Sequence, residues 1–176
     1  CGDENKSAEP ASVEVLLREA SPVLEAFGNA KTIRNDNSSR FGKYVRLHYA
    51  VDDRGGGGGG ASAPLLRVSG ARTEHFLLEK SRVAGPSHGE RNYHLFYEML
   101  AAAKNGDGIA APWRLAGRDA LTCALTQAGN CPQRKDGVDD AASFEQTCAA
   151  MDAMGFGADG RGAALALVAG LVHLGD

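Results

Sequence analysis

One stretch of the sequence, NDNSSRFGK at residues 35–43, combines side chains that can bind phosphate and a metal ion. The hydroxyls of Ser38 and Ser39 can coordinate a hard cation or bond a phosphate oxygen, and the amide of Asn35 can bond a polar ligand. Arg40 adds a guanidinium group that is always charged and that matches the geometry of a phosphate or a carboxylate. The chemistry expected of this loop is contact with an anionic ligand that carries a metal ion.

The same residue types would also suit a solvated turn that binds nothing, because Ser, Asn and Gly are common in turns. The position of the loop favours a ligand site, since it lies between an expected helix and an expected strand, where open α/β folds place loops that touch ligands. Gly42 would let the main chain pass close to such a ligand. Residue types alone leave both interpretations open.

The residues before this loop have helical periodicity. Apolar side chains recur at helical spacing at Leu16, Leu17, Val23, Leu24 and Phe27. Ser21-Pro22 predicts that one helix ends there and a second begins, because the residue before a proline is disfavoured in a helix and proline suits a first turn. Gly28-Asn29 predicts the end of the second helix. The polar residues 1–12 are expected to form a surface loop.

The residues after the loop alternate in polarity over 44–50, which predicts a strand. Residues 51–64 are expected to form a flexible connection, because they include six consecutive glycines at 55–60. A phosphate-binding use of these glycines is disfavoured, since Ala-Ser-Ala-Pro at 61–64 follows them instead of the Lys and Ser or Thr that such a loop needs.

The rest of the chain, residues 65–176, reads as a strand and several helices. The predicted elements are a strand over 75–83, a helix over 90–103, short helices joined by loops over 104–143, and helices over 144–154 and 163–174. GFGADGRG at 155–162 is expected to separate the last two helices. The aromatic stripe of Tyr93, Phe96 and Tyr97 is expected to pack in the core rather than to bind a cofactor.

The composition excludes several classes of function. The formal net charge of −3 provides no broad basic surface for a nucleic acid, so none is expected as a partner. The four cysteines form no CxxC pair, which excludes a common zinc or redox motif. No run of about 18 apolar residues and no leader pattern occur, so we expect neither a membrane span nor secretion. The ends, at Cys1 and at LVHLGD, are expected to be cut from a longer protein.

Several blocks of the sequence resemble the motor domain of myosin heavy chains, in the same order. EAFGNAKTIRNDNSSRFGK at 25–43 resembles the end of a helix and the switch I loop of that family. The later similar blocks are LLEKSRV at 77–83, GERNYHLFYEML at 89–100, GVDDAASF at 137–144, AMDAMGF at 150–156 and LVAGLVHLGD at 167–176. Kinesin motors are similar in the SSR core but continue with Ser-His, where this chain has Phe41-Gly42.

The resemblance implies an α/β fragment of a P-loop NTPase-type motor domain over residues 1–176, with strands of a mixed central sheet and helices of the upper motor region. The implied cofactors are ATP and Mg²⁺. Asn35 would contact the phosphate and ribose side of the nucleotide, and Ser39 would bind Mg²⁺. The implied catalytic residues are Ser38, which would position the attacking water, and Arg40, which would pair with a switch II glutamate.

Nine further residues match the resemblance and are expected to form framework hydrogen bonds and ion pairs: Asn29, Lys31, Thr32, Lys43, Glu79, Lys80, Arg82, Glu90 and Arg91. The implied partners are actin filaments and, through regions beyond this piece, calmodulin-like light chains. The implied location is the cytoskeleton in the cytoplasm.

The sequence also departs from the resemblance, because it contains neither a GxxxxGK[ST] phosphate loop nor a DxxGFE-like switch II segment. We therefore expect the piece alone to be inactive, and the ATPase activity to belong to a longer chain. Two alternatives remain open: a myosin-like actin tether or scaffold that no longer hydrolyses ATP, and a truncated gene product. The presence of Asn35, Ser38, Ser39 and Arg40 argues against the tether.

Overall fold

The first element of the computed structural model, which describes residues 13–52, 65–105 and 111–176, is the helix α1 (Val13–Gly28). It is continuous, so the predicted break at Ser21-Pro22 is wrong. Pro22 lacks the donor that would bond the carbonyl of Arg18 four residues earlier. Because Arg18 is exposed, water can bond that carbonyl, and the burial of Val23 and Ala26 holds the turns beyond the proline.

The helix ends at Gly28, as predicted, and the chain enters the loop of interest. The strand β1 (Asn29–Ala30) pairs antiparallel with β2 (Ser38–Ser39), so residues 31–37 form a closed loop between them. Gly28 cannot carry a side chain here, because a Cβ atom would overlap the ring of Phe41. This contact fixes the position at which the chain leaves β2.

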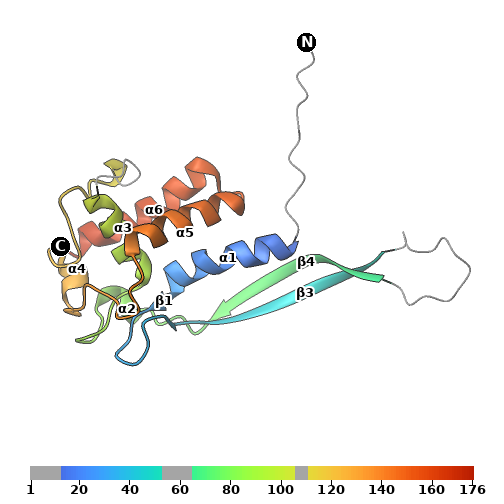
Figure 1. Ribbon diagram of the computed structural model, residues 1–176, viewed down its shortest axis with the longest axis horizontal. Helices are drawn as coiled ribbons and strands as arrows, with labels where there is room; N and C mark the ends of the chain where they lie inside the picture. Colours follow the sequence, from blue (N-terminus) through green and yellow to red (C-terminus); the bar gives the residue numbers. More distant parts are fainter. Residues whose placement is uncertain (1–12, 53–64, 106–110) are drawn as a thin grey trace, which may run out of the picture.

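A long antiparallel hairpin follows, which runs beside α1 at its base and then extends beyond the helices in Figure 1. It consists of β3 (Gly42–Asp52) and β4 (Leu65–Phe76), with Gly42 opposite Phe76 and an irregularity between His48 and Tyr49. The predicted strand over 44–50 is confirmed and is longer than expected. The predicted glycine-rich connection falls largely on residues 53–64, which lie outside the described residues.

The strand predicted over 75–83 is wrong beyond Phe76. Leu77 has a φ of 58°, which takes the chain out of the extended conformation, and residues 81–84 form the short helix α2 (Ser81–Ala84). The apolar residues of this segment suggested a strand, but main-chain hydrogen bonds hold it in a turn. The N–H of Glu79 donates to the carbonyl of Arg40, and the N–H of Arg82 donates to the carbonyl of Glu79.

The core is built around the helix α3 (His94–Lys104), which contacts α1, α5 (Asp140–Ala153) and α6 (Gly157–Leu174). The main buried apolar side chains are Tyr93, Leu95, Phe96, Tyr97, Met99, Leu100, Phe144, Leu165 and Val172. The aromatic stripe therefore packs in the core, as predicted. The helix begins at residue 94 rather than 90, because Arg91 donates its main-chain N–H to Lys31 and Tyr93 bridges to Ala30.

The remaining elements are short, as predicted for residues 104–143. They are the 3-10 helix η2 (Ala111–Trp113) and the helix α4 (Ala124–Gln127). The helix α6 begins at Gly157, so the predicted helix breaker ends earlier than expected, and its later glycines lie within the exposed first turns of α6. Helices and two small antiparallel sheets confirm the α/β fold class. None of the helices in the described ranges is long and apolar enough to cross a membrane.

An ion pair between a buried arginine and a half-buried aspartate joins the segment before α3 to the start of α5. Arg91 is inaccessible to solvent, and its Nη2 lies 2.6 Å from Oδ2 of Asp140. The guanidinium carbon of Arg91 also lies 3.7 Å from the centre of the Tyr97 ring. Within the described residues, Nε and Nη1 of Arg91 and Oδ1 of Asp140 have no hydrogen-bond partner. The pair therefore depends on one strong contact and a cation–π interaction.

We predict that Asp140→Ala lowers the free energy of unfolding by about 3–5 kcal/mol, because it leaves the buried charge of Arg91 without its carboxylate. The measurement is urea-induced unfolding of the chain followed by circular dichroism. Asp159→Ala is the matched control, since Asp159 is an exposed acidic residue in the first turn of α6. Equal losses of unfolding free energy in the two variants would contradict the prediction. They would show that Asp140 stabilises the chain only through its charge near a helix N-terminus, as Asp159 does.

Candidate functional site

The loop between β1 and β2 is closed by its own hydrogen bonds. Thr32 donates its main-chain N–H to the carbonyl of Asn35 at 2.8 Å, and its hydroxyl donates to the same oxygen at 3.1 Å. Oδ1 of Asn35 accepts from the main-chain N–H of Asn37 at 2.8 Å. The side chain of Asn35 is exposed, and its amide nitrogen has no hydrogen-bond partner within the described ranges. It is therefore available to a ligand.

Lys31 anchors the start of this loop rather than serving as a free cation. Its side chain is buried, and Nζ donates to the carbonyl oxygens of Thr32 at 3.1 Å and Gly89 at 3.0 Å. The carboxylate of Asp36 lies 4.0 Å away. These contacts confirm the framework role expected for Lys31 and Thr32.

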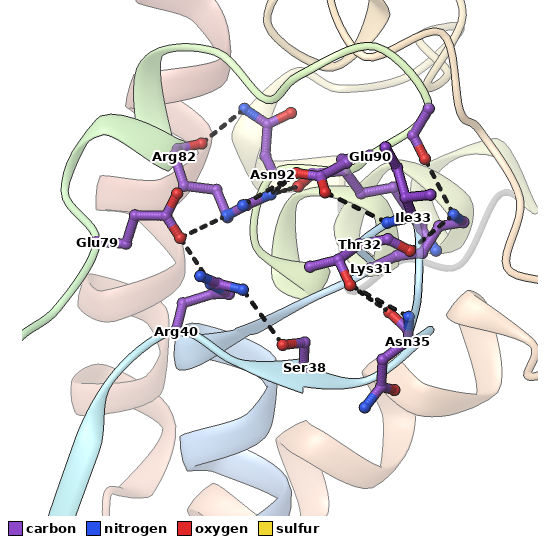
Figure 2. A network of polar contacts seen from close by, with 12 residues as sticks. Lys31, Thr32, Ile33, Asn35, Ser38, Arg40, Glu79, Arg82, Glu90 and Asn92 are labelled. Atoms are coloured by element: carbon purple, nitrogen blue, oxygen red, sulfur yellow. Dashed lines mark hydrogen bonds and ion pairs between the residues drawn. The ribbon is translucent and has the colours of Figure 1, made fainter.

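The two serines of β2 have different partners. Oγ of Ser38, which is half-buried, accepts a hydrogen bond from Nη1 of Arg40 at 3.2 Å. Oγ of Ser39, which is exposed, donates to the carbonyl of Phe41 at 2.8 Å and keeps its lone pairs for another partner. Figure 2 shows Ser38 and Arg40 turned toward each other, whereas the side chain of Asn35 points away from both. The structure thus brings together Ser38 and Arg40 but not Asn35.

Arg40 is part of a chain of ion pairs that reaches into the protein (Figure 2). Its Nε lies 2.6 Å from Oε2 of Glu79, and Nε of Arg82 lies 2.9 Å from the same oxygen. Arg82 also bonds Oε2 of Glu90 through Nη1 and Nη2, both at 3.1 Å. The hydrogen bond and charge of Arg82, and then those of Arg40, lower the pKa of Glu79. Glu79 is the partner of Arg40 that the sequence analysis did not identify.

Asn37 joins the loop to three other elements. Its Nδ2 donates to Oε2 of Glu25 at 3.0 Å, and its Oδ1 accepts from Nδ2 of Asn29 at 2.9 Å. Nε2 of His94 lies 3.2 Å from the same Oδ1. Because this oxygen can only accept, His94 must carry its proton on Nε2. Burial and the charges of Arg134 and Arg91 lower the pKa of His94 to about 3, which keeps the ring neutral.

A cleft of about 420 Å³ lies behind this contact, between α1, α3 and α5. Its lining includes Asn37, His94, Glu98, Arg134 and Thr147. The hydroxyl of Thr147 donates to Oε2 of Glu98 at 3.3 Å. Burial, and then the charge of Asp140, raises the pKa of Glu98 to about 7. The loop is therefore backed by a His94 ring that is neutral near neutral pH and by a Glu98 carboxyl whose pKa lies near 7.

The described residues contain no cluster of three or more His, Cys, Asp or Glu side chains that could hold a metal ion. Ser39 offers one neutral oxygen, which suits Mg²⁺ only as one ligand among several. Mg²⁺ takes six oxygen ligands and usually keeps waters and substrate phosphates among them. The donor set of the loop therefore fits a Mg²⁺ ion that a phosphate ligand brings with it, and it does not fit a permanent metal site.

Comparison with known proteins adds independent information. The model of the family "Myosin head (motor domain)" matches residues 1–176. Myosin-VIIa of Drosophila melanogaster is 39% identical over 171 residues, which cover 93% of this chain and 7% of that protein. Unconventional myosin-XV of Homo sapiens is 41% identical over 166 residues, with 93% of this chain and 4% of that protein covered. Myosin-51 of Schizosaccharomyces pombe is 38% identical over 175 residues, with 99% and 11% covered. The chain spans only a small part of the length of these relatives.

The buried carboxyl of Glu98 predicts a pH-dependent stability. Folding raises its pKa from 4.5 to about 7, so the folded chain holds this proton more tightly than the unfolded chain. The stability from this group is fully present below pH 4.5 and is lost as the pH rises through about 7. Glu98→Gln removes this loss and keeps an acceptor for Thr147. The change that it causes in the free energy of unfolding should therefore be more favourable at pH 8 than at pH 4 by roughly 3 kcal/mol.

The measurement is the urea dependence of unfolding at both pH values. Glu145→Gln, at an exposed position of α5, is the matched control and should show no such difference. A Glu98→Gln variant whose effect is the same at pH 4 and pH 8 would show that the carboxyl is not held protonated in the fold.

Proposed function

Because this chain belongs to the myosin head (motor domain) family, we propose that it is the nucleotide-sensing part of an actin-based motor that couples Mg-ATP hydrolysis to movement along actin filaments. The observation that carries the proposal is the loop at 31–40. Its main chain is held by internal hydrogen bonds, while Asn35 and Ser39 remain exposed and Arg40 lies beside Ser38. A fixed main chain with free polar side chains is what recognition of a phosphate ligand requires.

In this proposal each residue of the loop has a separate task. The free amide of Asn35 contacts the phosphate and ribose side of the nucleotide, and the lone pairs of Ser39 provide one ligand for Mg²⁺. Oγ of Ser38 accepts from Arg40, which leaves its own proton free to orient a water molecule near the terminal phosphate. Arg40 pairs with a carboxylate when the site closes. Bound Mg²⁺ would neutralise charge on the phosphates.

The complete reaction needs groups that this sequence does not contain. A GxxxxGK[ST] loop is absent from it, so the phosphates would be cradled by another part of the longer protein. We therefore propose that residues 1–176 alone neither bind ATP tightly nor hydrolyse it. Actin filaments are the proposed partner of the whole motor, light chains of the calmodulin type would bind outside this chain, and the proposed location is the cytoskeleton in the cytoplasm.

We predict that Arg40→Ala in the complete motor lowers actin-activated ATP turnover by at least about a hundredfold, since it removes the guanidinium whose ion pair closes and orders the site around the phosphates. The affinity for a fluorescent ATP analogue should change by less than about threefold, because Asn35 and Ser39 are unaltered. The measurements are steady-state ATPase rates with and without actin, and nucleotide titrations. Normal turnover in this variant would remove Arg40 from its proposed role.

Arg67→Ala is the matched control, because Arg67 is exposed on β4 and makes no ion pair within the described residues. It should leave turnover and nucleotide affinity unchanged. If the unmodified complete motor itself binds actin without ATP turnover, the function would instead be that of an actin tether.

A further inference from the structure

We propose that Glu79 is the resting counter-ion of Arg40, which holds the guanidinium while the nucleotide site is open and releases it when the site closes. This inference rests on the proposed function, in which Arg40 pairs with a carboxylate elsewhere in the motor. It makes Glu79 a positioning residue, because Glu79 acts through Arg40 and does not itself touch the nucleotide.

The first observation is that one oxygen atom serves two cations. Oε2 of Glu79 lies 2.6 Å from Nε of Arg40 and 2.9 Å from Nε of Arg82 (Figure 2). The two arginines therefore share a single carboxylate oxygen. Either cation could leave, and Glu79 would still have the other as its partner.

The second observation is that the two arginines differ in what they would lose. The side chain of Arg82 is 6% exposed, and it also bonds Glu90 and the carbonyl of Arg91. The side chain of Arg40 is 29% exposed, and Glu79 is its one carboxylate partner within the described ranges. Arg82 is thus fixed by burial, whereas Arg40 can move into solvent at low cost. If Arg40 leaves, Glu79 remains paired with Arg82 and no buried charge is stranded.

The third observation is that the main chain holds both residues in place whether or not their side chains are paired. The main-chain N–H of Glu79 donates to the carbonyl of Arg40 at 3.0 Å, and that of Arg40 donates to the carbonyl of Gly28 at 2.8 Å. The hydroxyl of Tyr93 donates to the carbonyl of Glu79 at 2.8 Å. Release therefore needs only a rotation of the Arg40 side chain.

The release would also change the surroundings of Ser38. In the described state Nη1 of Arg40 donates to Oγ of Ser38, so the guanidinium occupies one lone pair of the hydroxyl. When Arg40 rotates away from Glu79, this hydrogen bond is altered at the same time. When Arg40 leaves Glu79 for another carboxylate as the site closes, the hydrogen bonding of the Ser38 hydroxyl therefore changes too. This is the hydroxyl proposed to orient the attacking water.

The test is Glu79→Gln in the complete motor. Glutamine keeps the size of the side chain and an oxygen that can accept from Arg82, but it removes the charge that holds Arg40. The closed state should become more favourable, and the ratio of bound ADP and phosphate to bound ATP, measured by rapid quenching without actin, should rise roughly two- to fivefold. The rate of ATP binding should be unchanged. An unchanged or lower ratio would overturn the proposal.

Glu90→Gln is the matched control, because it removes the other carboxylate of Arg82 and leaves the pair of Arg40 and Glu79 intact. Its ratio should equal that of the unmodified motor, and an equal rise in both variants would overturn the proposal by showing that any loosening of Arg82 has this effect. The outcome is separable from that of the proposed function. Normal turnover in Arg40→Ala would refute the function itself, whereas loss of turnover there with an unchanged ratio in Glu79→Gln would refute only this inference.

Discussion

The structure around the loop depends on the need to neutralise one buried cation, Arg82. A buried guanidinium is stable only with carboxylates and carbonyls around it, and Arg82 collects Glu79 and Glu90 for this purpose. These two carboxylates also contact the loop at two points, because Glu79 pairs with Arg40 and Glu90 accepts from the main-chain N–H of Ile33 at 3.3 Å. The carboxylates that neutralise buried Arg82 therefore also help to position the loop at the surface.

The helix α3 shows the same principle with other groups. Its first turns carry His94, whose ring burial keeps neutral, and Glu98, whose pKa burial raises to about 7, close to the ion pair of Arg91 and Asp140. Such groups lower the stability that an apolar core of the same volume would have. They contribute specific polar contacts instead, because Nε2 of His94 lies within hydrogen-bond distance of Oδ1 of Asn37 in the loop. Polar contacts of α3 thus connect the core of the chain to the candidate site.

The features that the sequence predicts correctly are those set by residues close together in the chain. The strand after the loop and the burial of Tyr93 and Phe96 follow from composition and spacing, whereas the choice of this loop as a ligand site rests on its resemblance to the family. The break at Pro22 and the strand beyond Phe76 were wrong, because each outcome depends on contacts with residues far along the chain. Burial of the α1 face outweighs the proline, and the main-chain hydrogen bonds that join Glu79 to Arg40 and Arg82 outweigh the strand propensity of its neighbours. The pair of Arg40 and Glu79 joins residues separated by the whole hairpin, and no local pattern encodes it.

The hairpin places Arg40 and Glu79 together at its base. The strand β3 begins two residues after Arg40 and β4 ends three residues before Glu79, with Gly42 opposite Phe76. The bond from the N–H of Glu79 to the carbonyl of Arg40 joins the two main chains just beyond the end of this ladder. The pairing of the two strands therefore fixes the separation of the two main chains, whereas the side-chain pair at the base is half-exposed and weak. A rigid ladder that ends in an exchangeable ion pair allows the site to change state without a change in the strands that support it.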